Sequence, residues 1–215
     1  MAFDLDRDVF GDDFVDEEAA TEYEKELLRI FAASPESRSL AEGEGPSFWV
    51  RELVHLGIYY LGVTPARMSV TECSEIVFEL FPKKISCAPE DAAEIVAHLT
   101  AFWKFVAREF GLPHAHECLG ILGPRAVGRL EEALDDPSNY GMAKSFVMWA
   151  RGNDFDVQST SGLQDAMLAY NAQLTTSPNT FSVGGTRGES PSSADREERR
   201  RRRKAERARR KGQRR

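Results

Sequence analysis

The sequence predicts an all-α protein: a compact bundle of about six to seven helices between a disordered acidic N-terminal arm and a disordered basic C-terminal tail. Three observations predict this fold class. Apolar residues recur at spacings of three and four in several stretches, which is the period of an amphipathic helix. No long alternation of apolar and polar residues, typical of a strand, occurs in the chain. Charge is divided between an acidic body and a basic end.

The chain opens with an acidic stretch and then a helical pattern. Residues 1–15 are rich in Asp and are predicted to form a flexible arm. A helix is expected over residues 16–33, where apolar side chains recur every three or four positions. Ser34-Pro35 ends this helix, because the residue before a proline avoids the α region. Residues 35–46 follow as a loop.

Two further helices are expected before Pro82. Residues 47–62 are strongly apolar, but this stretch is only about 16 residues long and contains charges, so it favours a buried core helix over a membrane span. Ser69 and Glu72 have the spacing of a capping box. This spacing predicts a helix over residues 70–81, which Pro82 ends.

The clearest helical pattern runs from Pro89 to Gly111. Proline suits the first helical position, and the acidic pair that follows it complements the helix dipole. Residues 114–134 are expected to form one or two helices, broken at Gly123-Pro124.

The last two helices have their own start signals. Asp136-Pro137 repeats the pattern of a cap followed by proline and predicts a helix over residues 137–151. Ser161 opens a second capping-box spacing, which predicts a helix over residues 162–173.

These elements predict four segments. Residues 1–15 form the acidic arm, residues 16–174 a single helical domain, residues 175–194 a linker and residues 195–215 a basic tail. The linker is rich in Ser, Thr, Gly and Pro, a composition that buries too little apolar surface to order a chain.

Composition bounds the cellular location. No stretch reaches the ~18 to 20 apolar residues needed to cross a bilayer, and the N-terminus lacks the apolar core of a signal peptide. The three cysteines, Cys73, Cys87 and Cys118, agree with a reducing compartment rather than a disulfide framework. A cytoplasmic protein with no membrane partner is therefore expected.

Four phrases stand out in the body: FPKKIS at 81–86, AFWKFV at 101–106, DPSNYGMAKSF at 136–146, and YNA at 170–172, a few residues after Leu163-Gln164. Together they resemble a family of uncharacterised bacterial helical proteins with no assigned activity. The resemblance implies a single helical domain and no particular function. Related chains often lack a basic tail, so the resemblance implies no role for it.

The tail is the feature that indicates a class of partner. Residues 196–215 hold 13 Arg or Lys and 3 Glu, a net charge of +10, whereas the other 195 residues hold 15 basic and 32 acidic side chains, a net charge of −17. Guanidinium groups present a fork of donors that suits phosphate oxygens, and neutralising a nucleic-acid backbone releases counterions. The predicted polyanion-binding residues are Arg199, Arg200, Arg201, Arg202, Arg203, Lys204, Arg207, Arg209, Arg210, Lys211, Arg214 and Arg215.

The function predicted from these features is that of a binding or adaptor protein. Its tail contacts RNA, DNA or the ribosome with little sequence preference, and its helical body engages a protein partner. Two other readings of the tail stay open: a solubilising segment, or one that folds back on the acidic body. Residues 1–20, which hold eight acids and one base, could mask it in the second case.

The alternative is a small-molecule-binding protein or an enzyme with a site in the helical body. A pocket where His55, His98 or Lys144 converge would define such a site, and Lys144 together with Lys83 and Lys84 could bind an anion.

Recognisable catalytic and metal-binding spacings are missing from the sequence. His114 and Cys118 are the only local pair of base and nucleophile, and His116 lies between them at a spacing that cannot share one helix face. No CxxC, HExxH or GxxxxGK[ST] motif is present. No catalytic residue, metal ligand or cofactor is therefore predicted, and whether the chain is an enzyme stays open, with plain binding favoured.

Overall fold

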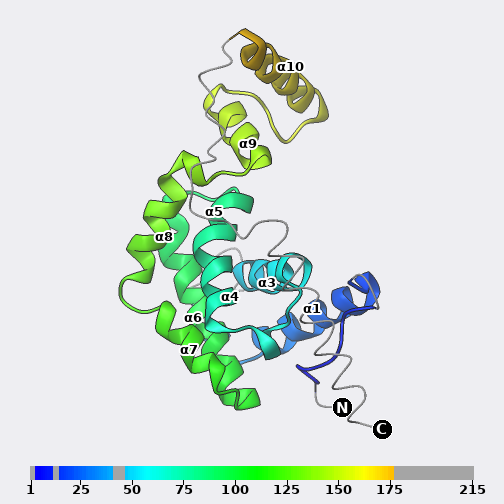
Figure 1. Ribbon diagram of the computed structural model, residues 1–215, viewed down its shortest axis with the longest axis vertical. Helices are drawn as coiled ribbons and strands as arrows, with labels where there is room; N and C mark the ends of the chain where they lie inside the picture. The colour runs from blue at the N-terminus through cyan, green and yellow to red at the C-terminus, as the bar shows by residue number, and fades with distance from the viewer. Residues whose placement is uncertain (1–2, 12–14, 41–46, 177–215) are drawn as a thin grey trace. The chain divides into compact units, whose positions relative to one another are not determined.

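The computed structural model describes residues 3–11, 15–40 and 47–176. In these ranges the secondary structure is helical and forms no sheet, apart from one isolated antiparallel bridge between Phe10 and Val15 (Figure 1). The predicted all-α class is confirmed. Within the described ranges, no helix is both long and apolar enough to cross a membrane. The linker from residue 177 onward and the whole basic tail lie outside the described residues.

The described residues cluster into two compact units, whereas the sequence predicts one helical domain over residues 16–174. The first unit holds the described residues up to Ile76 together with Ile95–Gly123. The second unit holds Val77–Glu94 and the described residues from Pro124 onward.

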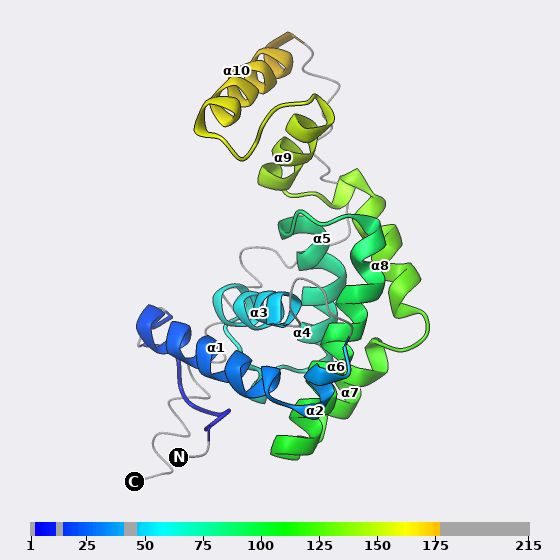
Figure 2. The same ribbon diagram turned by 180° about the vertical axis from the view of Figure 1, so that it is seen from behind.

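The first unit has an aromatic core. Its elements are α1 (Glu17–Ala32), α2 (Pro35–Arg38), α3 (Ser47–Leu56), the π-helix η1 (Gly57–Leu61), the 3-10 helix η2 (Pro65–Arg67), α4 (Val70–Glu75), most of α6 (Ala92–Phe110) and α7 (His114–Ile121). Helix α1 lies beside α3, and α4 beside α7, as both views show (Figures 1 and 2). Phe31 of α1 packs edge-to-face on Phe102 of α6, with ring centroids 5.6 Å apart. Such aromatic pairs add to the stabilisation from burial alone.

Local start signals set the helix bounds of the first unit. The Asp16 side chain accepts from the Ala19 backbone N–H and caps α1. The predicted capping box before α4 is confirmed, since Ser69 Oγ accepts from the Glu72 N–H and Glu72 Oε2 accepts from the Ser69 N–H at 2.8 Å. Such caps satisfy backbone donors that have no partner inside the helix.

Residues 3–11 of the predicted N-terminal arm, which spans residues 1–15, lie within the described structure. Within that range, residues 3–11 contact α1: Leu5 and Val9 are buried, and the Tyr23 hydroxyl donates to the Leu5 carbonyl oxygen at 3.0 Å. The Arg7 guanidinium lies 5.7 Å from the centroid of the Tyr23 ring. Although this segment is rich in acidic residues, it contains two buried apolar side chains, Leu5 and Val9. Burial of these side chains stabilises the contact of the segment with α1.

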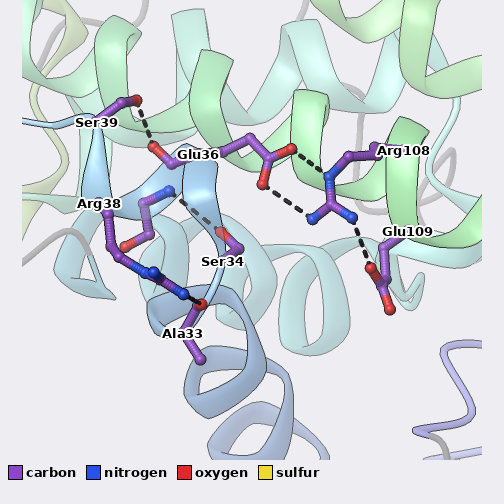
Figure 3. A network of polar contacts seen from close by, with 8 residues as sticks. Ala33, Ser34, Glu36, Arg38, Ser39, Arg108 and Glu109 are labelled. Carbon is purple, nitrogen blue, oxygen red and sulfur yellow. Dashed lines mark hydrogen bonds and ion pairs between the residues drawn. The ribbon is translucent and has the colours of Figure 1, made fainter.

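An ion pair joins α2 to α6 within the first unit (Figure 3). Glu36 Oε1 accepts from Arg108 Nε at 2.6 Å, and Glu36 Oε2 accepts from Arg108 Nη2 at 3.1 Å, which makes a two-pronged contact. The other side of the guanidinium donates to Glu109 at 2.8 Å. The hydrogen bond from Arg108 lowers the pKa of Glu36.

The second unit consists of short helices and one helical hairpin. Its elements are the π-helix η3 (Ile76–Leu80), α5 (Phe81–Lys84), the 3-10 helix η4 (Pro89–Asp91), the start of α6, α8 (Ala126–Asp135), the 3-10 helix η5 (Pro137–Asn139), α9 (Met142–Gly152) and α10 (Thr160–Thr176). The first residue of η3, Ile76, belongs to the first unit. Helix α5 contacts α8 and α9, and α9 contacts α10. The predicted break at Gly123-Pro124 is confirmed by the separation of α7 from α8.

The starts of α9 and α10 correct two predictions. Helix α9 begins at Met142 rather than at residue 137, because residues 137–139 form the separate turn η5. Helix α10 begins at Thr160, and Ser159 Oγ accepts from the Gly162 N–H at 3.1 Å. The predicted capping box at Ser161 is therefore wrong, because the preceding serine does the capping.

Candidate functional site

Two of the phrases singled out in the sequence meet in the second unit. The Gly141 backbone N–H donates to the Lys83 carbonyl oxygen at 3.0 Å, which ties the start of α9 to α5. A Cβ atom added at Gly141 would lie only 2.7 Å from that oxygen. The approach of the two segments therefore requires a residue without a side chain at this position.

Lys144, the third residue of α9, is the unusual residue near this contact. It is 2% exposed, and its Nζ has no hydrogen-bond partner in the part of the chain that the structure describes. Nζ lies 4.3 Å from the centroid of the Tyr140 ring, a distance that permits a cation–π contact. Burial lowers the pKa of Lys144, because the charged form has lost its water.

Tyr140 and Cys87, the two described groups that contact or act on Lys144, are both uncharged at neutral pH. The Tyr140 hydroxyl donates to the Leu134 carbonyl oxygen at 2.8 Å, and burial raises the pKa of this phenol. Burial also raises the pKa of the nearby Cys87 to about 11, although the charge of Lys144 opposes that rise. The Cys87 thiol is therefore protonated at neutral pH, and the ammonium group has no anionic partner there.

The N-terminus of α9 is uncapped. Its N-cap is Gly141, which has no side chain to accept from the first N–H groups, and no acid stands in the first turn. The sequence predicts Asp136 as the cap of this helix, but its carboxylate accepts from the Ser138 N–H at 2.9 Å and caps η5 instead. Met142, the first residue of α9, is 82% exposed, so solvent reaches this end of the helix.

His114, His116 and Cys118 were the sequence candidates for a metal or a nucleophile. His114 Nε2 lies 3.0 Å from the Pro65 carbonyl oxygen, and the fully buried Cys118 points its thiol at the Met68 carbonyl oxygen, 3.9 Å away. Within the described ranges, no group of three or more His, Cys, Asp or Glu side chains is arranged to hold a metal ion.

The sequence does not predict that the thiol of Cys118 contacts that of Cys73 in α4. The hydrogen bond between the two thiols, together with burial, raises the pKa of Cys73 well above its ordinary value. No spacing rule links positions so far apart, so only the packing of α4 on α7 reveals the pair.

The other two residues predicted to line a pocket, His55 and His98, belong to the first unit, whereas Lys144 belongs to the second. His55 Nδ1 lies 3.4 Å from Glu24 Oε1, and its ring stacks on that of Tyr59 with centroids 4.4 Å apart. Burial raises the pKa of Glu24, and the nearby His55 opposes that rise. His98 is buried in α6.

Comparison with known proteins gives no relative for this chain: no protein-family model, no curated protein and no solved structure matches it. The resemblance to uncharacterised bacterial helical proteins stays a prediction. All the predicted polyanion-binding residues, from Arg199 to Arg215, lie outside the described residues. The features of the chain that indicate a function are therefore the basic residues of the tail and the surroundings of Lys144.

Proposed function

We propose that this chain is a binding protein whose basic tail contacts polyanions, namely RNA or DNA, free or within the ribosome. The observation that supports the proposal is the concentration of 13 Arg or Lys with only 3 Glu in residues 196–215, against a net charge of −17 over the rest of the chain.

Counterion release explains why such a segment binds nucleic acid. Each cation that neutralises a phosphate frees a condensed counterion, so affinity falls steeply with salt and depends little on sequence. No aromatic residue is present in residues 195–215, so base stacking contributes nothing to recognition. The pairs Glu197–Arg201 and Glu206–Arg210 have helical i,i+4 spacing, which favours folding of the tail on its partner.

The test compares the full-length chain with a variant in which all 13 Lys and Arg of residues 196–215 are replaced by Gln. Fluorescence anisotropy of a labelled RNA and of a labelled DNA duplex measures affinity at several salt concentrations. Wild type should lose about 10³-fold or more in affinity between about 50 and 200 mM salt if it contacts six or more phosphates.

The neutral-tail variant should retain no measurable affinity for either nucleic acid. Lys104→Gln serves as the matched control, since Lys104 is an exposed lysine on α6. Equal binding by wild type and the neutral-tail variant would contradict the proposal.

A protein partner for the helical body belongs to the same proposal. Met167 and Leu168 of α10 and Met142 of α9 are exposed large apolar side chains, which supports a protein-contacting surface on this hairpin. Replacing Met167 and Leu168 by Ser should weaken capture of such a partner while polyanion binding stays unchanged.

Small-molecule binding by the helical body is the second candidate function. One observation favours it: the buried Lys144 amine has no hydrogen-bond partner in the described residues and lies at an uncapped helix N-terminus. Buried groups with a perturbed pKa are concentrated at functional sites, and the chemistry of an amine suits an anion.

A further inference from the structure

We propose that the N-terminus of α9, together with the amine of Lys144, binds a small molecule through a phosphate group. This inference rests on small-molecule binding as the second candidate function and is independent of the basic tail. The site belongs entirely to the second unit.

The helix end provides the first half of the site. Helix α9 is 11 residues long, so its aligned peptide dipoles place a partial positive charge at Met142. The backbone N–H groups of Met142, Ala143 and Lys144 belong to the first turn, which the helix itself leaves without acceptors. With Gly141 as N-cap and no acid nearby in the turn, the described residues supply no side-chain acceptor in their place.

The amine of Lys144 is the second, independent observation. Side chains of a helix lean toward its N-terminus, and the 4.3 Å contact of Nζ with the Tyr140 ring places the amine beside the residue that precedes the N-cap. Burial disfavours the charged form of the amine, and the contact with the Tyr140 ring offsets only part of that cost. An anion at the helix end would offset that cost, because the same anion would accept from the backbone N–H groups and from Nζ.

The neighbouring polar groups either have partners of their own or are uncharged at neutral pH. Asp136 is engaged by the Ser138 N–H, the Tyr140 hydroxyl donates to Leu134, and the Cys87 thiol is protonated at neutral pH. Three acids act on these groups: Asp91 on Cys87, and Asp135 and Asp136 on Tyr140. No carboxylate forms a hydrogen bond with Nζ in the described ranges.

The geometry favours a phosphate over a carboxylate. Divergent N–H groups at a helix N-terminus match the several oxygens of a tetrahedral anion, and lysine binds phosphate as a point charge beside them. A planar carboxylate offers only two oxygens to the same donors. The exposed Met142 leaves room for the remainder of a phosphorylated molecule on the solvent side.

Residue-resolved NMR on the isotope-labelled full-length chain tests the site. Inorganic phosphate is titrated at constant ionic strength, and glycerol 3-phosphate and acetate are titrated in parallel. We expect saturable shifts of the Met142, Ala143 and Lys144 amides with both phosphates, and none with acetate. Binding by inorganic phosphate alone would indicate a free-phosphate site, and binding by both would indicate a phosphomonoester site.

Variants separate this site from other effects. Lys144→Met should weaken phosphate binding at α9 by about tenfold or more, since it removes a charge-assisted hydrogen bond. Lys104→Met, on α6, is the matched control and should leave binding unchanged. Equal affinity in wild type and Lys144→Met, or phosphate-induced shifts confined to residues outside α9, would overturn the inference.

These experiments test the polyanion-binding tail and the phosphate site at α9 independently. The neutral-tail variant should lose nucleic-acid binding but keep the phosphate-induced shifts of α9. If acetate binds at α9 and phosphate does not, small-molecule binding stands and the phosphate inference is wrong.

Discussion

At the scale of single residues, Gly141 is required for steric reasons rather than for its flexibility. Its φ of −72° is ordinary for any residue, but its missing Cβ would lie 2.7 Å from the Lys83 carbonyl oxygen. The hydrogen bond from Gly141 to Lys83 depends on that approach.

Gly141→Ala should therefore destabilise the protein by about 1 to 3 kcal/mol, as an overpacked site does. Gly128→Ala is the matched control, because a Cβ at Gly128 of α8 meets nothing within 4 Å. Alanine in that helix should stabilise by about 0.5 to 1 kcal/mol. Urea unfolding measures both, and equal effects of the same sign would refute the steric argument.

Lys144 makes a pH-dependent contribution to stability. Burial holds its pKa in the folded chain below the ordinary value of 10.5. Between the two pKa values the unfolded chain binds more protons, so stability rises with pH through that window. The cost of the buried charge is fully present below the folded pKa and is gone above 10.5.

Lys144→Met removes that charge and should stabilise the protein at pH 7 by on the order of 1 kcal/mol. The gain over wild type should shrink as the pH approaches 10.5. Urea unfolding at pH 7 and pH 10 measures the difference, with Lys104→Met as a control expected to stay within about 0.5 kcal/mol. A variant less stable than wild type at pH 7 would show that the amine stabilises the fold.

At the scale of elements, α2 is a single turn that an ion pair joins to α6. The Arg108 guanidinium donates two hydrogen bonds to Glu36 and a third to Glu109 (Figure 3). The Arg108 side chain is 46% exposed and the Glu36 side chain 14% exposed, and salt weakens ion pairs that solvent reaches.

Because Arg108 lowers the pKa of Glu36 from its ordinary 4.5, this contact stabilises the folded chain above pH 4.5 and loses its effect as the pH falls through the lower, folded value. Glu36→Gln should therefore be less stable than wild type at pH 7, and the difference should disappear in acid or in 1 M salt. Urea midpoints at pH 7 and pH 3 test this. Glu131→Gln, an exposed acid on α8, should show no such convergence.

The elements also show what the sequence could predict. The sequence correctly predicts the capping box at Ser69, the proline start at Pro89 and the break at Gly123-Pro124. Each of these features depends on residues only a few positions apart. The predicted start of α9 at residue 137 is wrong because the Asp136 carboxylate accepts from the Ser138 N–H and caps η5 instead. Both caps use nearby residues, and the sequence does not indicate which of the two forms.

Features that depend on distant segments were not predictable. Lys144 is a candidate in the sequence, but its burial is set by the packing of the folded chain and not by its neighbours in sequence. The meeting of Cys73 with Cys118 and the packing of Leu5 on α1 likewise join residues far apart in sequence. Hydrophobic period identifies the face of a helix that is buried, but it does not identify the segment that covers it.

At the scale of the whole molecule, charge is the dominant feature. The +10 of residues 196–215 and the −17 of the remainder attract each other, and residues 1–20 alone hold eight acids. The Debye length is about 30 Å at 0.01 M salt and about 3 Å at 1 M, so this attraction acts over the size of a domain only at low salt.

If the tail folds back on the acidic body, the full-length chain should be more compact at about 0.01 M salt than at about 1 M. Small-angle X-ray scattering measures the radius of gyration in both conditions. The neutral-tail variant keeps the chain length and should lose this expansion, whereas wild type should also expand when excess RNA competes for the tail. If the radius of gyration depends on salt in the same way in both chains, the charge of the tail does not draw it onto the body. The acidic body would then not compete with polyanions for the tail.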